Sequence, residues 1–464
     1  MSYSAINKNS SSKSAALNIF LAGINAADPY LAIKRCLSSD GQSLTIKLDL
    51  DNTSHIRTEP WSKVHVIAIG KAACAMSKAA QEIIPAHLLT TPSIAVTNYE
   101  NVIEVLQTKV IGAGHPLPDQ NGYNAAQCCE ETLIRAQKDE LVLVLISGGG
   151  SALIPYPTDD ITLEDKIITT NLLLACGATI NEINCVRKHL SKLKGGGFSR
   201  LAAPADLHAF ILSDVLGDDL SSIASGPTVP DPSTYSDAIT IFKNYGTWEK
   251  VPCKVKQHLE QGHLGNLPET PKIHDIIFKK CTQTLIGSNA ISVNAALNAS
   301  VQLEYKTQLY DGHLCGEART AAEKWALAAK QLQKIGISKP LAFVAGGETT
   351  VSLKGTGSGG RNQEFALAFV LAAHRNGLTG KWTFLSGGTD GRDGPTDAYG
   401  GIVDQDSFAR MKLAGLNPQE LLDNNDSNAA LQGSNDLLIT GTTGTNVADL
   451  QVLLLYPTVI PTLL

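Results

Sequence analysis

The sequence lacks the features that mark several classes of protein. Its formal charge is −6, with 38 basic and 44 acidic residues, so it has no excess of positive charge to neutralise a nucleic-acid backbone. No apolar run is long enough to cross a bilayer, and the first residues lack the apolar segment of a signal peptide. We therefore expect neither a nucleic-acid partner nor a membrane partner.

The nine cysteines lack any pattern that is typical of a metal site or a disulfide framework. They are scattered along the chain, odd in number and contain no C-x-x-C pair. Reduced thiols and a cytoplasmic location are the expectation.

Aromatic residues are scarce at 5%, whereas glycine is abundant with 40 residues. A content of 43% apolar and 18% charged residues is typical of a globular protein. A chain of 464 residues also exceeds what one hydrophobic core usually supports. Two or three domains are therefore expected.

Short apolar runs recur along the chain, each followed by a glycine cluster and often by a helical pattern. Strands buried on both faces of a parallel sheet have this composition. The runs lie at 64–70, 140–152, 208–218, 341–348, 382–391 and 435–446. Since ligands bind in open parallel sheets where strand ends meet their loops, candidate site residues are sought directly after these runs.

This pattern predicts two α/β domains with mostly parallel sheets. A Pro-rich stretch at 225–235 and a polar segment up to about Pro271 separate the two halves, and the boundary is placed near residue 255. The expected domains are 1–255, Rossmann-like, and 256–464, with the core of the second at about 340–455. The apolar end of the sequence predicts a buried final strand followed by a packed tail.

In the first half, Lys71 follows Gly70 between a strand and the start of a helix. The helix dipole disfavours a cation there unless an anion is bound as well, so Lys71 is a candidate phosphate ligand, with a solvated lysine as the alternative. A second candidate is the small-residue segment after the next strand, whose amide groups could close around a phosphate or simply form a tight turn. Its members are Ser147, Gly148, Gly149, Gly150 and Ser151. A hydrolase elbow is not supported, because Leu153 occupies the last glycine position of G-x-S-x-G.

Arg187, Ser191 and Lys194 have the spacing of one helical face and precede Gly195 and Gly196. This pattern fits an anion site or a solvated charged face. In the next apolar run, Asp214 ends the strand and Asp218 follows four residues later. Such carboxylates are suited to bind Mg²⁺ or to accept a proton, although helix-capping aspartates have the same pattern.

In the second half, the glycines at 355–360 satisfy G-x-G-x-x-G, and Arg361 follows at a helix start. As a dinucleotide fingerprint the segment is incomplete. The preceding residues alternate between polar and apolar and so do not have the pattern of a buried strand, and no acidic residue lies about 20 positions further on. Gly359, Gly360 and Arg361 are candidate phosphate ligands, the arginine through two parallel hydrogen bonds. Asp390 lies in a loop that could bind magnesium or a ribose, although turn-forming aspartates have the same pattern. Thr443 lies in a loop that resembles a phosphate cradle. A Walker A motif is absent.

Eight separated segments occur in a fixed order: GKAACAM, GHPLPDQNG, LISGGGSAL, VRKHLSKLKGGG, SDVLGDDLSSIASGPTVPDPS, GGETTVSLKGTGSGGRNQEFALA, SGGTDGRDGPTDAYGG and GTTGTNV. Together they resemble the class II glycerate 2-kinases, which carry the C-terminal domain known as MOFRL and have often been labelled hydroxypyruvate reductases. The resemblance extends from about Ala16 to Leu455.

The resemblance implies a site in the cleft between two α/β domains and transfer of the γ-phosphoryl group of ATP to the 2-hydroxyl of D-glycerate, with Mg²⁺. Carried over by motif, Lys71, Asp214 and Arg361 are the expected catalytic residues. Lys71 and Arg361 would neutralise the phosphoryl group, and Asp214 would orient or deprotonate the hydroxyl or bind the metal. Asp218, Glu348 and Asp390 are further candidate metal ligands. A homodimer is considered, with the oligomeric state left open.

Two other functions remain open from the sequence. An NAD(P)H-dependent hydroxypyruvate reductase would use the G-x-G-x-x-G segment, and a non-catalytic regulator would use the glycine loops to bind a sugar phosphate.

Overall fold

The computed structural model describes residues 11–50, 52, 54–439, 441 and 443–457, so the tail expected at 458–464 lies outside it. Two compact units make up the chain. The first unit is Pro29–Ile286, and the second combines the residues up to Asp28 with those from Gly287 onward. The chain leaves the first unit at residue 286 rather than near the expected boundary at 255, because the last strand of the first sheet still follows.

A six-stranded sheet forms the centre of the first unit, in the order β6-β5-β4-β7-β8-β9. Its neighbouring pairs from β6 to β8 are all parallel, as the sequence predicts. The strands are β4 (Val64–Ile69), β5 (Ser93–Asn98), β6 (Thr108–Ala113), β7 (Leu141–Ile146), β8 (Asp206–Leu212) and β9 (Cys281–Gly287).

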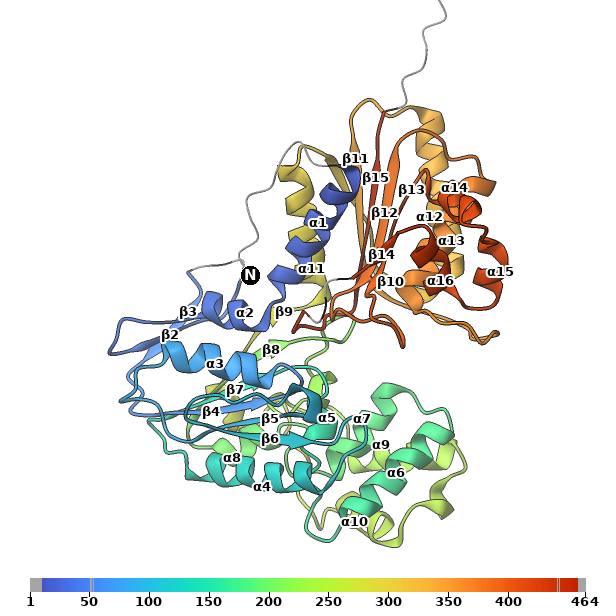
Figure 1. Cartoon of the computed structure of the whole chain (residues 1–464). Helices are drawn as coiled ribbons and strands as arrows, with labels where there is room; N and C mark the ends of the chain where they lie inside the picture. The colour runs from blue at the N-terminus through green and yellow to red at the C-terminus, as the bar shows by residue number, and fades with distance from the viewer. Residues whose placement is uncertain (1–10, 51, 53, 440, 442, 458–464) are drawn as a thin grey trace, which may run out of the picture. The chain divides into compact units, whose positions relative to one another are not determined.

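Helices cover both faces of this sheet (Figure 1). Successive side chains of a strand point to opposite faces. Accordingly, Ile67 and Ile69 pack with α4 (Gln120–Arg135) and α8 (Gly197–Ala202), whereas Val66 and Ala68 pack with α2 (Pro29–Cys36) and α3 (Ala73–Ile83). The continuous apolar run of β4 therefore serves two separate hydrophobic cores.

Other helices of the first unit form a cluster with a hydrophobic core of its own, which contains Leu173, Val186, Phe242 and Leu259. These helices are α6 (Leu163–Ala175), α7 (Ile180–His189), α9 (Tyr235–Asn244) and α10 (Cys253–His263). A small antiparallel sheet and several short helices complete the unit: β1 (Leu37–Ser39), β2 (Leu44–Lys47), β3 (Ile56–Glu59), α5 (Gly150–Leu153), η1 (Tyr99–Asn101), η2 (Ile223–Ser225), η3 (Trp248–Lys250) and η4 (Ile276–Lys280).

The second unit also has a six-stranded sheet, in the order β10-β11-β15-β12-β13-β14. β10 and β11 are parallel, but β15 lies antiparallel between β11 and β12, and the β12–β13 and β13–β14 pairs are antiparallel too. The α/β fold class is thus confirmed, with β13 and β15 running against the other strands. The strands are β10 (Lys306–Glu317), β11 (Leu341–Thr350), β12 (Trp382–Gly388), β13 (Gly400–Asp404), β14 (Leu437–Leu438) and β15 (Asp449–Leu455).

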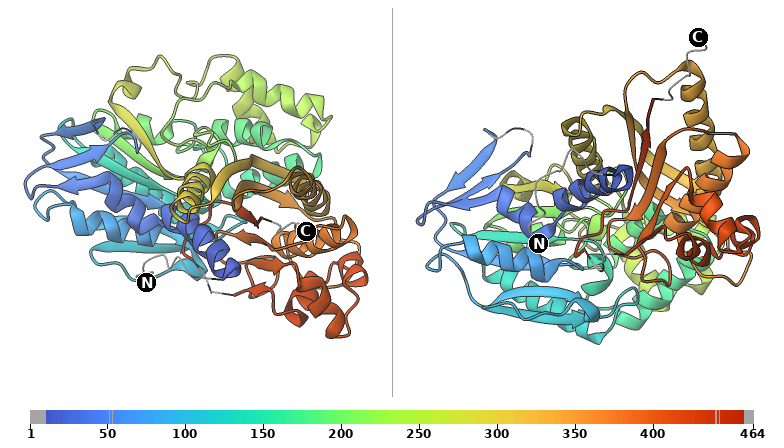
Figure 2. Two further views of the ribbon diagram at one scale, coloured as in Figure 1. Left: turned by 90° about the horizontal axis from the view of Figure 1, so that it is seen from above. Right: turned by 45° about the horizontal axis from the view of Figure 1, so that its top comes forward.

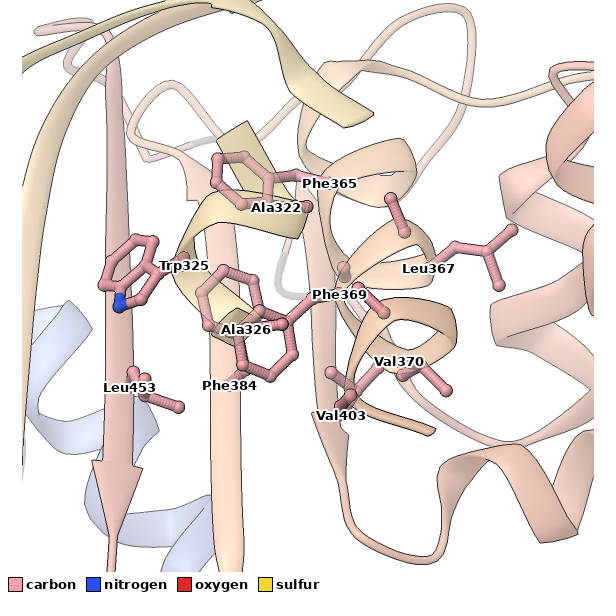
Figure 3. Close-up of a cluster of buried hydrophobic side chains, with 14 of the residues drawn as sticks. Ala322, Trp325, Ala326, Phe365, Leu367, Phe369, Val370, Phe384, Val403 and Leu453 are labelled. Atoms are coloured by element: carbon pink, nitrogen blue, oxygen red, sulfur yellow. The ribbon is translucent and has the colours of Figure 1, made fainter. Parts of the chain in front are cut away.

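One face of the second sheet packs against α12 (Ala318–Ile335) and α13 (Arg361–Arg375). Figure 3 shows Trp325 beside Phe365, Phe369 and Phe384 in this core, and Phe369 stacks on Phe384 with ring centroids 4.2 Å apart. The shorter helices of this unit are α14 (Ser407–Leu413), α15 (Pro418–Asp423) and α16 (Ser427–Gly433).

The opposite face of the second sheet packs against α1 (Ser12–Ala26) and α11 (Asn289–Gln302), which lie side by side (Figure 2). Phe20 of α1 is fully buried and stacks on Tyr399, with ring centroids 5.7 Å apart. The first described helix therefore belongs to the unit that the end of the chain builds.

Two expectations from composition can be compared with the structure. All nine cysteines are free, as predicted. Within the described ranges, no single helix has the length and hydropathy needed to span a membrane.

Candidate functional site

The centre of the candidate site is the contact between the loops that follow β4 and β7. Gly70 has φ +117°, a conformation that favours glycine, and an added Cβ would lie 2.2 Å from Ser147 Oγ. The buried Ser147 hydroxyl accepts a hydrogen bond from the Ala72 amide at 3.0 Å, and the Lys71 amide donates to the carbonyl of Gly148 at 2.9 Å. Gly70 and Ser147 thus join the two strand ends and fix the backbone of Lys71.

Three predicted or nearby polar side chains surround the turn at Gly148 and Gly149. An added Cβ on Gly148 would lie 2.1 Å from Asp214 Oδ2, so the carboxylate that follows β8 rests directly on this glycine. A Cβ on Gly149 would lie 3.0 Å from the ring of His115 and 3.5 Å from Cε of Lys71. Burial lowers the pKa of His115, and the positive charge of Lys71 lowers it further. The turn therefore brings a carboxylate, an ammonium group and an imidazole together.

Ser151 is held by a network of buried polar groups. The ammonium of Lys194 donates to its carbonyl at 2.7 Å and to its hydroxyl at 2.8 Å. The same hydroxyl lies 3.0 Å from that of Ser225, which donates to Oδ1 of Asn184 at 3.0 Å. This network fixes the beginning of α5 beside the turn at Gly148 and Gly149.

Two pockets of the first unit meet at this network. One has a volume of about 400 Å³ and is lined by His115, Lys166 and Lys194 together with apolar side chains. The other has a volume of about 410 Å³ and includes Asp214. Gly149, Ser151 and Arg187 line both pockets.

Three cations line the first pocket: Lys166 from α6, Arg187 from α7 and Lys194 from the turn after α7. Lys166 and Lys194 are 7% and 3% exposed. Within the described ranges of the chain, the Lys166 ammonium has no hydrogen-bond partner. Burial lowers the pKa of Lys166 to about 7, with a contribution from Arg187, and holds that of Lys194 well below its usual range, with contributions from Lys166 and Arg187. Among the described residues, no carboxylate forms an ion pair with any of the three.

A neighbouring lysine shows how the chain treats a buried cation that has a structural role. Lys188 is also buried, and its ammonium lies 3.3 Å from the buried carboxylate of Asp231. Burying a charge without such a partner costs several kcal/mol. The cluster at Lys166, Arg187 and Lys194 therefore has the electrostatics of an anion-binding site.

The predicted metal ligands of the first unit lie in the loop after β8. Asp214 is half-buried, and Asp218 has φ +55°. No helix begins at either residue, so the alternative reading as helix caps does not apply to them. The neighbouring Asp219 accepts hydrogen bonds from Ser221 and Ser222 instead. In the described part of the chain, no group of three or more His, Cys, Asp or Glu residues is placed to bind a metal ion by itself.

Arg361, at the start of α13 in the second unit, is held by two carboxylates. Its Nε and one terminal nitrogen donate to Asp449 at 2.6 and 3.0 Å, and the other terminal nitrogen lies 2.8 Å from Glu348. Asp449 is fully buried, and burial raises its pKa to about 6 despite the arginine. The guanidinium thus has a fixed orientation, and Glu348 acts as its partner.

The glycine-rich loop before Arg361 packs against protein rather than enclosing an open space. A Cβ on Gly359 would lie 2.1 Å from Ser427 Oγ, and one on Gly360 would lie 2.3 Å from Cγ of Asp393. The Asp393 carboxylate accepts hydrogen bonds from the amides of Asn362 and Gln363 at 3.1 and 2.8 Å. A side chain of the protein therefore occupies the place at the helix N-terminus that a pyrophosphate would take in a dinucleotide site.

Two further predicted residues of the second unit lie next to each other. Asp390 accepts a hydrogen bond from the amide of Arg392 at 3.0 Å, and the Thr443 hydroxyl donates to the carbonyl of Thr389 at 2.5 Å. Both polar groups stabilise the loops after β12 and before β15.

The structure brings most of the predicted residues of the first unit together. Lys71, Asp214 and the turn at 148–151 meet as expected, and Arg187 and Lys194 line one pocket. However, α7 ends at His189, so Lys194 lies in the following turn and not on the predicted helical face. The amides of Gly195 and Gly196 donate to the carbonyls of Ser225 and Gly226 at 2.9 and 2.8 Å. These two amides therefore form hydrogen bonds within the protein rather than pointing toward a ligand.

Sequence reasoning missed several residues of these sites: Lys166, Asn184, Ser225 and Asp449. A lysine directly before the apolar residues of KIITTNLLLA was the one visible signal for Lys166. In the described structure, the side chains of the other three contact residues far along the chain, which no local pattern indicates.

Comparison with known proteins shows matches over nearly the whole chain. Residues 15–260 match the family described as "Domain of unknown function (DUF4147)", and residues 341–449 match the MOFRL family. A D-glycerate 2-kinase of Thermotoga maritima is 39% identical over 445 residues, which are 94% of this chain and 97% of the relative. A glycerate 2-kinase of Pyrococcus horikoshii is 39% identical over 437 residues, which are 92% and 94% of the two chains. A crystal structure of glycerate kinase from Thermotoga maritima has a TM-score of 0.83 at 37% identity and covers 96% of this chain and 99% of its own.

Proposed function

Because this chain belongs to the family of class II glycerate kinases, we propose that it transfers the γ-phosphoryl group of ATP to the 2-hydroxyl of D-glycerate, giving 2-phosphoglycerate and ADP. The observation that carries the proposal is the turn at Gly148 and Gly149, where Asp214 and Lys71 lie against adjacent residues beside a cationic pocket. Phosphoryl transfer is accelerated mainly by positioning and by neutralisation of charge, and this turn supplies both.

In the proposed reaction, the Asp214 carboxylate orients the 2-hydroxyl of glycerate and accepts its proton, or binds the metal ion. The Lys71 ammonium neutralises charge on the transferring phosphoryl group. Arg361 is the proposed cation of the second unit, where Asp449 holds its guanidinium in place.

Magnesium is proposed as the metal that accompanies ATP. In kinases, Mg²⁺ is bound by one or two carboxylates together with substrate phosphates, and it neutralises their charge. Asp214, with Asp218 in the same loop, fits this requirement without a ligand cage made only of protein. Nine free cysteines further support a reducing compartment such as the cytoplasm.

A hydroxypyruvate reductase receives less support from the structure. Its dinucleotide would require the helix N-terminus at 361–363, whose amides bind Asp393. We expect no loss of nicotinamide absorbance when the protein is mixed with NADH or NADPH and hydroxypyruvate. A regulator that only binds a sugar phosphate would release no ADP, so the kinase assay distinguishes it from the proposed enzyme.

The proposal is tested by measuring ADP release with D-glycerate and Mg·ATP and by passing the product to enolase, which accepts the 2-phosphate and not the 3-phosphate. Lys71→Ala should lower kcat/KM by about 10²- to 10⁴-fold, because one charge is lost from the transition state. Lys78→Ala is the matched control, since Lys78 is exposed on α3 and should leave the rate unchanged. Absence of turnover, or full activity of Lys71→Ala, would contradict the proposal.

A further inference from the structure

The pocket at α6 and α7 contains more positive charge than the described protein around it balances. Lys166 has a buried ammonium without a hydrogen-bond partner among the described residues, and Arg187 and Lys194 line the same pocket. Burial disfavours the charged form of each of the three side chains and so lowers its pKa. The positive charges nearby lower the pKa of the two lysines further. A buried cluster of like charges is unfavourable unless an opposite charge is bound beside it, so these three cations are stabilised by a bound anion.

The chain pairs a buried lysine with a carboxylate where the lysine has only a structural role. Lys188 lies on the same helix as Arg187 and contacts the buried Asp231 at 3.3 Å. By contrast, Lys194 binds only the carbonyl and hydroxyl of Ser151 in the described structure, and these neutral groups leave its charge uncompensated. The missing counter-charge is therefore expected from a ligand.

We propose that Lys166, Arg187 and Lys194 form the subsite that binds the carboxylate of the hydroxy-acid acceptor and so select acids over neutral polyols. This inference rests on the proposed function and names the part of the site that recognises the acceptor. Lys166 is then a specificity-determining residue.

The arrangement of the two pockets favours the acceptor's carboxylate over a phosphate of the nucleotide. In a 2-hydroxy acid, the reacting hydroxyl is attached to the carbon next to the carboxylate. Gly149, Ser151 and Arg187 line both the cationic pocket and the neighbouring pocket that includes Asp214. An acid anchored by the cations can therefore direct its hydroxyl past Ser151 toward Asp214. The predominantly apolar remainder of the cationic pocket suits a small organic acid.

The inference is tested by removing one charge while keeping the shape of the side chain. Binding of D-glycerate to the full chain is measured by titration calorimetry without nucleotide, for the wild type, Lys166→Met and Arg187→Gln. Glycerol serves as the ligand that lacks the carboxylate, and inorganic phosphate as the alternative anion. Lys192→Met is the control variant, because Lys192 pairs with the exposed Asp159 close to the same turn.

Lys166→Met and Arg187→Gln should each weaken the binding of D-glycerate by about tenfold or more, because a charged hydrogen bond is lost. The KM for ATP should stay within twofold of the wild type, glycerol should not bind, and Lys192→Met should bind D-glycerate normally. Loss of a buried, unpaired charge should also raise the melting temperature of Lys166→Met in the absence of ligand, which excludes misfolding as the cause of weaker binding.

Two results would overturn the inference. One is unchanged affinity for D-glycerate in both variants. The other is a raised KM for ATP and loss of phosphate binding with normal glycerate affinity, which would assign the cations to the nucleotide.

The binding assay also separates this inference from the proposed function. If the protein binds D-glycerate through Lys166 but releases no ADP, the carboxylate subsite is supported and the kinase function is contradicted. If both variants turn over normally and have unchanged affinity and KM for D-glycerate, the kinase function is supported and the subsite is contradicted.

Discussion

At the scale of single residues, the protonation of Lys166 couples the stability of the protein to pH. Burial lowers its pKa from 10.5 to about 7, and the charged or titratable groups around its pocket are Arg187, Lys194 and His115. Between pH 7 and 10.5 the unfolded chain binds more protons than the folded chain, so the free energy of unfolding rises with pH. Below about pH 7 the cost of burying the charge is present in full.

We therefore predict that the wild type, without ligand, gains stability relative to Lys166→Met as the pH rises from 7 to 9.5, by at most about 1.4 kcal/mol per pH unit. Urea unfolding of both proteins at each pH measures the difference. The titration of groups that do not interact with Lys166 cancels because both proteins contain them, whereas Lys194, whose pKa Lys166 lowers, contributes to the difference as well. Parallel pH profiles for the two proteins would contradict this assignment of the charge.

How much of the site the sequence predicts depends on whether a residue's environment is local. Lys71, Asp214 and the small residues at 148–151 were predicted because each directly follows a buried strand, and such loops meet at one edge of a parallel sheet. Arg361 was predicted at a helix start, but its partner Asp449 lies 88 residues further along the chain. No periodicity indicates a contact of that kind.

At the scale of secondary-structure elements, the turn after β7 depends on the absence of side chains. Gly148 has no positive φ, so its backbone accepts other residues, but an added Cβ would lie 2.1 Å from Asp214 Oδ2. The end of a side chain can move aside more readily than backbone can. Alanine at this position should therefore displace the carboxylate and leave the fold intact.

We predict that Gly148→Ala lowers kcat by about 10²-fold, since displacement of a reacting group by about 1 Å has an effect of that size. Steady-state kinetics at saturating substrates and a thermal unfolding curve measure the two quantities together. Gly312→Ala is the control, because the nearest atom to its added Cβ is 3.8 Å away. If Gly148→Ala lowered the melting temperature clearly below that of the wild type and of Gly312→Ala, the loss of activity would instead reflect a structural role of Gly148.

Five of the six predicted runs form strands of six residues or more, whereas the described part of the run at 435–446 contains only the two-residue β14, and β5, β6 and β13 were not predicted. The parallel direction was predicted correctly for β6 to β8 of the first sheet, but not for all strands of the second. An apolar run buried on both faces has the same composition whether its neighbours are parallel or antiparallel. β15 is such a run, and it lies antiparallel to both of its neighbours, which reverses part of the expected sheet. The G-x-G-x-x-G segment was similarly ambiguous, because Asp393, which caps the following helix, lies beyond the motif.

At the scale of the whole molecule, the chain crosses between its two units twice, at residues 28–29 and 286–287. The predicted boundary near 255 followed a change in composition, whereas the actual division follows contacts between distant segments. The second unit depends on α1 in particular, because that helix covers one face of a sheet whose first strand begins at Lys306. No pattern within α1 shows which of the two sheets it covers.

This dependence gives a prediction about stability. Phe20→Ala removes a fully buried ring that stacks on Tyr399, and Figure 2 shows its helix beside α11. Truncating a buried aromatic residue costs about 3–5 kcal/mol, since the cavity does not fill completely. Urea unfolding is followed by tryptophan fluorescence in a background that carries Trp61→Phe and Trp248→Phe, so that only Trp325 and Trp382 of the second unit report, and it should show a loss of this size. Leu413→Ala is the matched control, because Leu413 is 88% exposed in the same unit. Equal unfolding midpoints for Phe20→Ala and the wild type would mean that α1 does not stabilise the second unit.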